Sequence, residues 1–169
     1  MAAIDIMSTT NPERKMLILY LNTGTSSTPT WSAIGKYVSD SSMEYDWGEE
    51  TNTDILGNTY TTIKPPTITQ SFDTLKPTTK DSAVVKIWQQ AIRDQDIGAM
   101  QSNDLLVVHL YAGSSSSAMF AERYPESMVK PSSLGGSTAV DMAVDVTFGG
   151  ERSTGTASVS NGVVTYTAA

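Results

Sequence analysis

The stretch Leu105-Leu106-Val107-Val108-His109-Leu110-Tyr111 is apolar except for its histidine, and Gly113 and four serines follow it closely. A short apolar run of this kind, rich in leucine and valine and bounded by turn residues, predicts a strand. Other segments with strand patterns lie on both sides of it. We therefore take this stretch as the centre of a mainly β fold and interpret the rest of the chain outward from it.

One segment before this strand has the spacing of a helix. Residues 77–82 supply start signals and Gly98 supplies a stop. Between them, apolar residues recur at the spacing of one helix face, namely Val84, Ile87, Trp88, Ala91 and Ile92. The pattern predicts one helix that lays its Trp88 side across a sheet.

Several other segments are apolar or alternate with a period of two, as strands do. They are residues 16–21, 31–38, 43–47, 67–72 and 141–148. The chain closes with Asn161-Gly162 between two alternating runs, which is a strong signal for a β-hairpin. We expect about eight or nine strands and one helix, as the spacing of turn signals indicates.

The chain length and the absence of long linkers predict a single domain over residues 1–169. Residues 1–15 are expected to form an N-terminal arm or a short edge strand. We expect long loops over residues 22–30, 48–66 and 113–118, which are polar and rich in glycine, serine, threonine, asparagine or proline.

Composition excludes several classes of function. The 169 residues include no cysteine, 11 Lys+Arg and 18 Asp+Glu, giving a net charge of −7. Absence of cysteine excludes a disulfide scaffold and a thiolate metal site. The acidic balance argues against tight binding to nucleic acid or to an anionic membrane. We also expect no secretion signal, because the first residues lack a basic region and a long apolar core.

Searching for catalytic motifs finds little. His109 is the one histidine, and a lone histidine in an apolar strand is more often structural than catalytic. A nucleophile elbow, a phosphate-binding loop and a zinc-binding His-Glu motif are all missing from the sequence. Aromatic residues suggest sugar stacking, but at this spacing they are more often core or interface residues. We therefore predict no catalytic residue, no metal site and no cofactor.

Acidic residues give the most informative pattern. Between Lys36 and Lys64 there are six acids and no basic residue. A calcium site, a glycosidase pair, a solvated face and a surface that repels polyanions are the alternatives. Glu44 and Asp46 alternate with apolar neighbours on one predicted strand, and so do Asp141 and Asp145 on another. Two such strands side by side would form an acidic wall.

Several short segments spread over most of the chain together carry a resemblance to a known family. They are Trp31–Gly35, Asp54–Gly57, Gln70–Asp73, Ala121–Tyr124, Met128–Gly136 and Phe148–Arg152. Two early strands, one mid-chain helix and a closing Asn-Gly hairpin accompany them. In these features the chain resembles the major tail protein, or tail tube protein, of long-tailed, siphovirus-like bacteriophages.

This resemblance implies a β-sandwich or barrel-like subunit with a flanking helix. Such subunits form hexameric rings that stack into a tube, and their inner strands join a continuous β-barrel. The implied partners are further copies of the chain, the tape-measure protein, the tail terminator and the tail-tip or baseplate proteins. DNA passes through the lumen without specific binding. The implied location is the virion tail, assembled in the cytoplasm of the host bacterium.

Glu44, Asp46, Asp141 and Asp145 are then the candidates for an acidic lumen, because DNA binds cationic walls and not anionic ones. Two other functions remain open. One is a glycan- or receptor-binding β-sandwich on a virion or cell surface. The other is the tube of a related injection system, which carries effector proteins and not DNA. We do not expect an enzyme.

Overall fold

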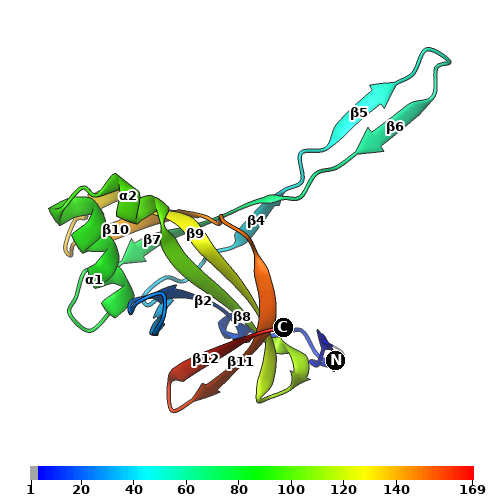
Figure 1. Cartoon of the computed structure of the whole chain (residues 1–169). Helices are drawn as coiled ribbons and strands as arrows, with labels where there is room; N and C mark the ends of the chain where they lie inside the picture. Colours follow the sequence, from blue (N-terminus) through cyan, green and yellow to red (C-terminus); the bar gives the residue numbers. More distant parts are fainter. Residues whose placement is uncertain (1–3) are drawn as a thin grey trace.

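The strand β9 (Ala118–Gly135) belongs to two sheets, and the fold is arranged about it. The computed structural model describes residues 4–169 (Figure 1). In the first sheet, the order is β3-β2-β8-β9-β11-β12, and in the second it is β9-β10-β7-β4. All pairs are antiparallel, so each chain reversal can be short.

The strands before the helices are β1 (Asp5–Ile6), β2 (Leu17–Asn22), β3 (Trp31–Ile34), β4 (Met43–Asp46), β5 (Glu50–Thr53), β6 (Thr59–Thr62) and β7 (Thr67–Leu75). The helical segments are η1 (Arg14–Met16), α1 (Ser82–Trp88), η2 (Gln89–Arg93) and α2 (Ile97–Gln101). The remaining strands are β8 (Asn103–Ser115), β9, β10 (Asp141–Thr147), β11 (Ser153–Ser160) and β12 (Val163–Ala168). None of the helices described has the length and apolar character that crossing a bilayer requires.

The central strand predicted from the sequence is β8, and both of its faces are buried. Leu105 and Val107 face the main core between the two sheets, which α1 also covers. Leu106 and Val108 face a second cluster on the other side of the first sheet, to which β11 and β12 contribute side chains. In the described residues β12 approaches β3 without pairing with it, so the sheet is not closed into a barrel. The predicted mainly β fold with one main helix is confirmed.

The predicted helix starts where expected but ends earlier. Asp81 caps α1, because its carboxylate accepts a hydrogen bond from the Val84 amide at 3.2 Å. Helical structure continues as a π-helix to Arg93. The prediction that Gly98 stops the helix was wrong, since Asp96 caps the new helix α2 and Gly98 lies in its first turn.

Strand boundaries also differ from the sequence predictions. Residues 4–169, which the structure describes, form twelve strands, because part of the predicted N-terminal arm pairs with β8 and residues 48–66 contain the hairpin β5–β6. Residues 113–118 are mostly strand, with β8 reaching Ser115 and β9 starting at Ala118. The strand predicted over 31–38 ends at Ile34, because Gly35 has a φ of +128° and leaves the extended region.

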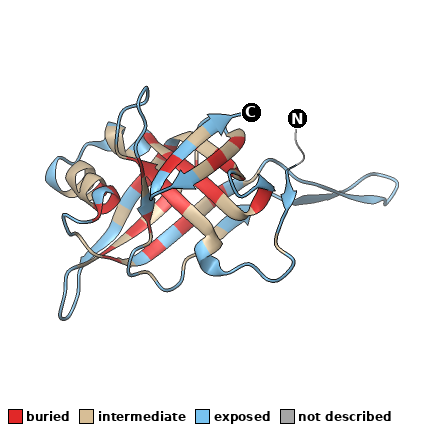
Figure 2. Cartoon of the chain, turned by 90° about the horizontal axis from the view of Figure 1, so that it is seen from below, coloured by how far each residue is buried: buried red, intermediate tan, exposed pale blue. Residues whose placement is uncertain are grey.

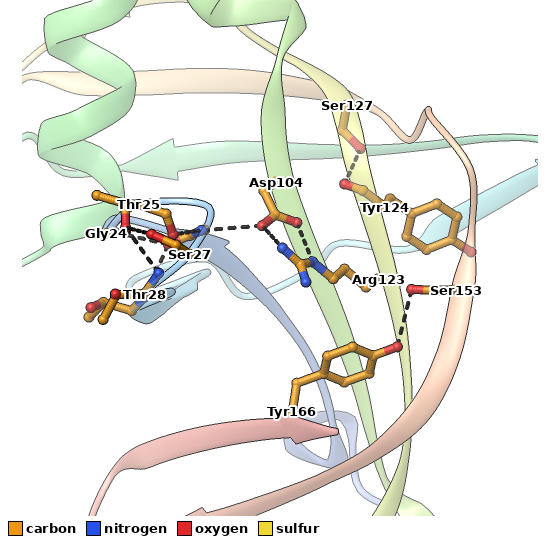
Figure 3. A network of polar contacts seen from close by, with 12 residues as sticks. Gly24, Thr25, Ser27, Thr28, Asp104, Arg123, Tyr124, Ser127, Ser153 and Tyr166 are labelled. Carbon is orange, nitrogen blue, oxygen red and sulfur yellow. Dashed lines mark hydrogen bonds and ion pairs between the residues drawn. The ribbon is translucent and has the colours of Figure 1, made fainter. Parts of the chain in front are cut away.

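The loop over residues 22–30 is held by one side chain. The Asn22 side-chain oxygen accepts hydrogen bonds from the amides of Gly24 (2.9 Å) and Thr30 (3.0 Å). Its amide nitrogen donates to Thr25 O and to Asp104, and Arg123 donates two hydrogen bonds to the same Asp104 carboxylate (Figure 3). This predicted loop therefore has a defined shape within the single chain.

The bend in β9 is fixed where the chain passes from β10 to β11. The Ser127 hydroxyl donates to Tyr124 O and accepts from the Gly149 amide at 3.1 Å (Figure 3 shows Tyr124 and Ser127). A Cβ on Gly149 would lie 2.5 Å from Glu126 O, and one on Gly150 would lie 2.8 Å from Glu126 N. Both positions therefore require glycine, because any side chain would push this connection away from β9.

We predict that Gly150→Ala destabilises the chain much more than Gly162→Ala. The two glycines have nearly equal φ values, +78° and +77°, but nothing lies within 4 Å of a Cβ on Gly162. The Gly162 variant should lose about 1 kcal/mol for the strained backbone alone. The Gly150 variant should lose roughly 2–3 kcal/mol more, since a side chain there overpacks the bend. Urea unfolding measures both, and equal losses would contradict the role given to the bend.

Candidate assembly surfaces

The four predicted acids lie on one face of the second sheet. In β10, Asp141 and Asp145 alternate with buried valines and a methionine, so they point away from the core. Glu44 of β4 lies opposite Thr69 of β7, and Thr69 lies opposite Thr147 of β10. Residues opposite each other share a face, so Glu44 and Asp46 lie on the same outer face as the β10 acids. The strand β7 lies between the two acidic strands, which are not direct neighbours.

Two of these acids pair with other side chains, and the other two are exposed. Asp141 forms an ion pair with Lys76, and Asp145 accepts a hydrogen bond from the Ser71 hydroxyl at 2.8 Å. Glu44 and Asp46 are exposed. Asp40, Glu44 and Asp73 line a shallow hollow of about 250 Å³ with serine and threonine side chains. The outer face is therefore hydrophilic and acidic, with no apolar side chain in that hollow.

The second surface is a projecting hairpin, residues 47–64. We call this hairpin the arm from here on, and it is distinct from the N-terminal segment over residues 1–15. Figure 1 shows it extending far from the two sheets, and Figure 2 shows its whole length as exposed. Every residue of β5 and β6 is exposed. Hydroxyl pairs hold the strands together, with Thr51 and Thr61 at 3.1 Å and Thr53 and Thr59 at 3.4 Å. An isolated two-stranded hairpin is marginally stable in water, so the arm gains most from a partner outside the chain.

The tip of the arm is a hydrogen-bonded turn that presents two apolar side chains. The Asp54 carboxylate accepts hydrogen bonds from the Leu56 amide at 2.8 Å and the Asn58 amide at 2.9 Å. These bonds and one from the Asn58 side chain lower the pKa of Asp54, with the Asn58 backbone amide as the largest cause. Ile55 and Leu56 are 102% and 81% exposed, the most exposed of the chain's large hydrophobic residues described. Such side chains at the end of a built turn indicate a contact with another molecule.

A polar cluster between β8 and β9 is the arrangement most like an active site. His109 Nε2 lies 2.8 Å from a Glu122 oxygen, and its Nδ1 lies 2.9 Å from the Tyr111 hydroxyl. The other Glu122 oxygen accepts hydrogen bonds from Tyr124 (3.2 Å) and Arg152 (2.7 Å). Burial alone would raise the pKa of Glu122, but the hydrogen bonds from His109 and Arg152 outweigh it and lower the pKa.

This cluster links three segments of the chain through hydrogen bonds. Burial, and then the charge of Glu122, raise the pKa of Tyr124, so its phenol is a poor nucleophile. Arg152 follows β10, whereas His109 and Glu122 come from β8 and β9, so the cluster ties three segments together. The sequence interpretation of His109 as a structural residue agrees with this geometry. In the described part of the chain, no group of three or more acidic or histidine side chains is placed to hold a metal ion.

The aromatic residues considered for sugar stacking are spread over the molecule. Trp31 is buried in the second cluster and Trp88 packs against the main core. Tyr45 and Trp47 are exposed and stacked, with ring centroids 6.1 Å apart, at the base of the arm. Tyr37 is exposed elsewhere, beside the Lys36 amine. They do not form one platform of the kind that a sugar needs.

Comparison with solved structures finds fold-level likenesses to parts of contractile injection systems. A sheath/tube terminator of an extracellular contractile injection system (PVC) has a TM-score of 0.46 and 11% identity, over 87% of this chain and 99% of that chain. The tube-terminating cap of the anti-feeding prophage has a TM-score of 0.46 and 13% identity, over 98% and 96%. A chain of the PVC sheath–tube complex has a TM-score of 0.45 and 11% identity, over 97% and 96%.

No family model matches the sequence, and no curated protein matches it either. Each TM-score lies below 0.5, so these likenesses carry no argument about function.

We predict that Glu122→Gln lowers stability at neutral pH and that the loss shrinks in acid. The folded-state pKa of Glu122 lies below its ordinary value of 4.5. A lowered pKa stabilises the fold above the ordinary value, and this contribution is lost as the pH falls through the folded-state pKa. At pH 7 the loss should be about 3 kcal/mol, because His109 and Arg152 lose a charged partner in a largely buried site.

Urea unfolding of both proteins at several pH values measures this difference. Glu151→Gln is the control, because Glu151 is exposed and precedes Arg152 directly. A difference between wild type and Glu122→Gln that stays constant down to pH 3 would contradict the assignment.

Proposed function

We propose that the chain is a structural subunit of a phage-tail-like tube assembly, either in the tube or in a ring that ends it. The observation that carries this proposal is the arm. Every residue of its two strands is exposed, it touches the rest of its own chain at its base, where Trp47 stacks on Tyr45, and it holds two exposed apolar side chains at a hydrogen-bonded tip. A single chain gains nothing from such a structure, whereas a repeating assembly buries it at every contact.

The acidic outer face of the second sheet supports a tube with a hollow interior. One face of this sheet packs on the core, so the other is free to line a lumen. Glu44, Asp46, Asp141 and Asp145 would then repel the phosphates of DNA and keep it from adhering to the wall. Hexameric rings, as the resemblance implies, place this face inward around the axis.

The remaining parts of the proposal follow the same resemblance. The chain's partners are other copies of itself, the tape-measure protein, the terminator and the tip or baseplate proteins. Its location is the assembled particle, with assembly in the bacterial cytoplasm. We assign no enzymatic step to the chain, and the raised pKa of Tyr124 and the internally paired Glu122 support that assignment.

We predict that the purified protein forms rings or tubes of uniform width and that Ile55→Ser with Leu56→Ser prevents it. Burying two such side chains contributes roughly 3–6 kcal/mol to each contact, and serine removes most of this. The variant should fold normally, because both side chains are exposed in the single chain. Negative-stain electron microscopy and sedimentation velocity measure assembly, and circular dichroism checks the fold.

Ile97→Ser is the matched control, since Ile97 is also an exposed isoleucine but lies on α2. It should assemble like wild type. If the wild-type protein stays monomeric at high concentration and also with an initiator complex supplied, the structural proposal fails. A glycan-binding function would then be the next to test.

We predict that Glu44→Lys with Asp46→Lys gives tubes that trap DNA. The two changes turn an acidic row into a basic one on the proposed lumen wall. Tubes assembled with short duplex DNA should then protect it from nuclease, and protection should fall as salt increases. Asp5→Lys with Glu151→Lys makes the same change of net charge on other exposed positions and should protect none. Equal protection by both variants would show that this face does not line the lumen.

A further inference from the structure

A long groove runs along the free edge of β3, at the border of the first sheet. Its volume is about 790 Å³, within the range of small-molecule binding sites and so large enough for a few side chains. The half-buried Leu17, Ile18 and Val38 supply accessible apolar lining, and the buried core residues Leu19, Ile34 and Phe72 lie beneath it. In the described residues β3 pairs with β2 on one side only, so the backbone groups of its other side have no strand partner, although β12 lies near them. The groove therefore offers both an apolar floor and an unpaired strand edge.

The rim of this groove is basic on a chain whose net charge is −7. Four of the 11 basic residues line it, namely Arg14, Lys15, Lys36 and Lys80. The carboxylates of the lining are Asp40 and Asp81, and Glu13 outside the lining pairs with Lys15 at 2.7 Å, so the rim keeps a small excess of positive charge. Arg14 donates its hydrogen bonds to the neutral backbone oxygens of Leu17 and Ser41, so they leave its charge unpaired. The groove therefore favours an apolar segment that also carries acids.

We propose that this groove receives the tip of the arm from a second copy of the chain. This inference rests on the proposed structural function and names the contact through which the subunits join. Ile55 and Leu56 enter the apolar part of the groove. Glu49, Glu50 and Asp54 of the arm face the basic rim. Apolar burial provides the attraction, and the opposite charges fix the orientation of the two copies.

The arm cannot fill the groove of its own chain. The groove reaches Val159 and Gly162 at the β11–β12 turn. Figure 1 places that turn and the arm at opposite ends of the molecule. A contact between different surfaces at opposite ends is heterologous, so it continues from copy to copy. Such a contact builds a ring when its rotation closes and a filament when it does not, and both occur in a tube of stacked rings.

The absence of cysteine allows a direct test by cross-linking. One variant carries Leu56→Cys in the arm, and a second carries Ala33→Cys, at an exposed residue of β3 that lines the groove. The two variants are mixed and treated with a short bis-maleimide. We expect a covalent dimer that contains one copy of each, identified by mass spectrometry of the joined peptides. Leu56→Cys mixed with Ser137→Cys is the control, because Ser137 is exposed and outside the groove.

Charge reversal supplies a second measurement. Lys36→Glu with Lys80→Glu should reduce the cross-link to Leu56→Cys by at least tenfold, and adding Glu49→Lys with Glu50→Lys to the arm partner should restore it. All four side chains are on the surface, so the variants should fold. Recovery by the exchange of charges shows that the arm and the rim meet, because a general loss of stability would not be reversed.

The outcomes separate this inference from the proposed function. Rings or tubes that form without the Leu56–Ala33 cross-link overturn the arm-in-groove contact and leave the structural role standing. The cross-link in a complex that never grows beyond two copies overturns the tube and leaves the contact standing. A cross-link that is equally strong with the Ser137 control overturns the contact, since the arm tip would then be meeting surfaces at random.

Discussion

The bend of β9 is the constraint on which the rest of the structure depends. At Glu126 the strand turns from the first sheet into the second, and only glycine at 149 and 150 lets the β10–β11 connection approach it so closely. Because one strand serves both sheets, their inner faces are brought together over one core, with α1 closing the side. The inner face of the second sheet therefore contributes most of its folding stability, whereas the residues of its outer face do not pack in the core.

This division separates the residues that fold the chain from those that face a partner. The large apolar side chains of β7 and β10 point inward, and serine, threonine and acids occupy the outer positions. The arm extends from the same sheet through β4 and β7 but shares no core with it. A change at the arm tip or on the acidic face therefore costs little folding energy, so these surfaces are free to be shaped by assembly.

The sequence was sufficient to predict much of this. Alternation in 141–148 correctly placed Asp141 and Asp145 opposite buried neighbours, and the run at 105–111 correctly located the central strand. The sequence could not predict which strands pair. Alternation shows which face of a strand a residue lies on but not which strand lies beside it, so the position of β7 between β4 and β10 was not predicted. The polar arm gave no burial pattern at all. Its only signal was Asp54-Ile55-Leu56-Gly57, where two apolar residues stand inside a turn sequence.

An exposed apolar tip on every copy carries the risk of unspecific aggregation, and the charges of the arm oppose it. Two arms that meet tip to tip bring Glu49, Glu50 and Asp54 of one copy against the same acids of the other. Lys64 is the one cation near them, and it pairs with Glu50 of its own arm. Like charges disfavour that pairing, whereas the basic rim of the groove favours the arm. The apolar tip thus provides affinity, and the acids behind it restrict which surface can use that affinity.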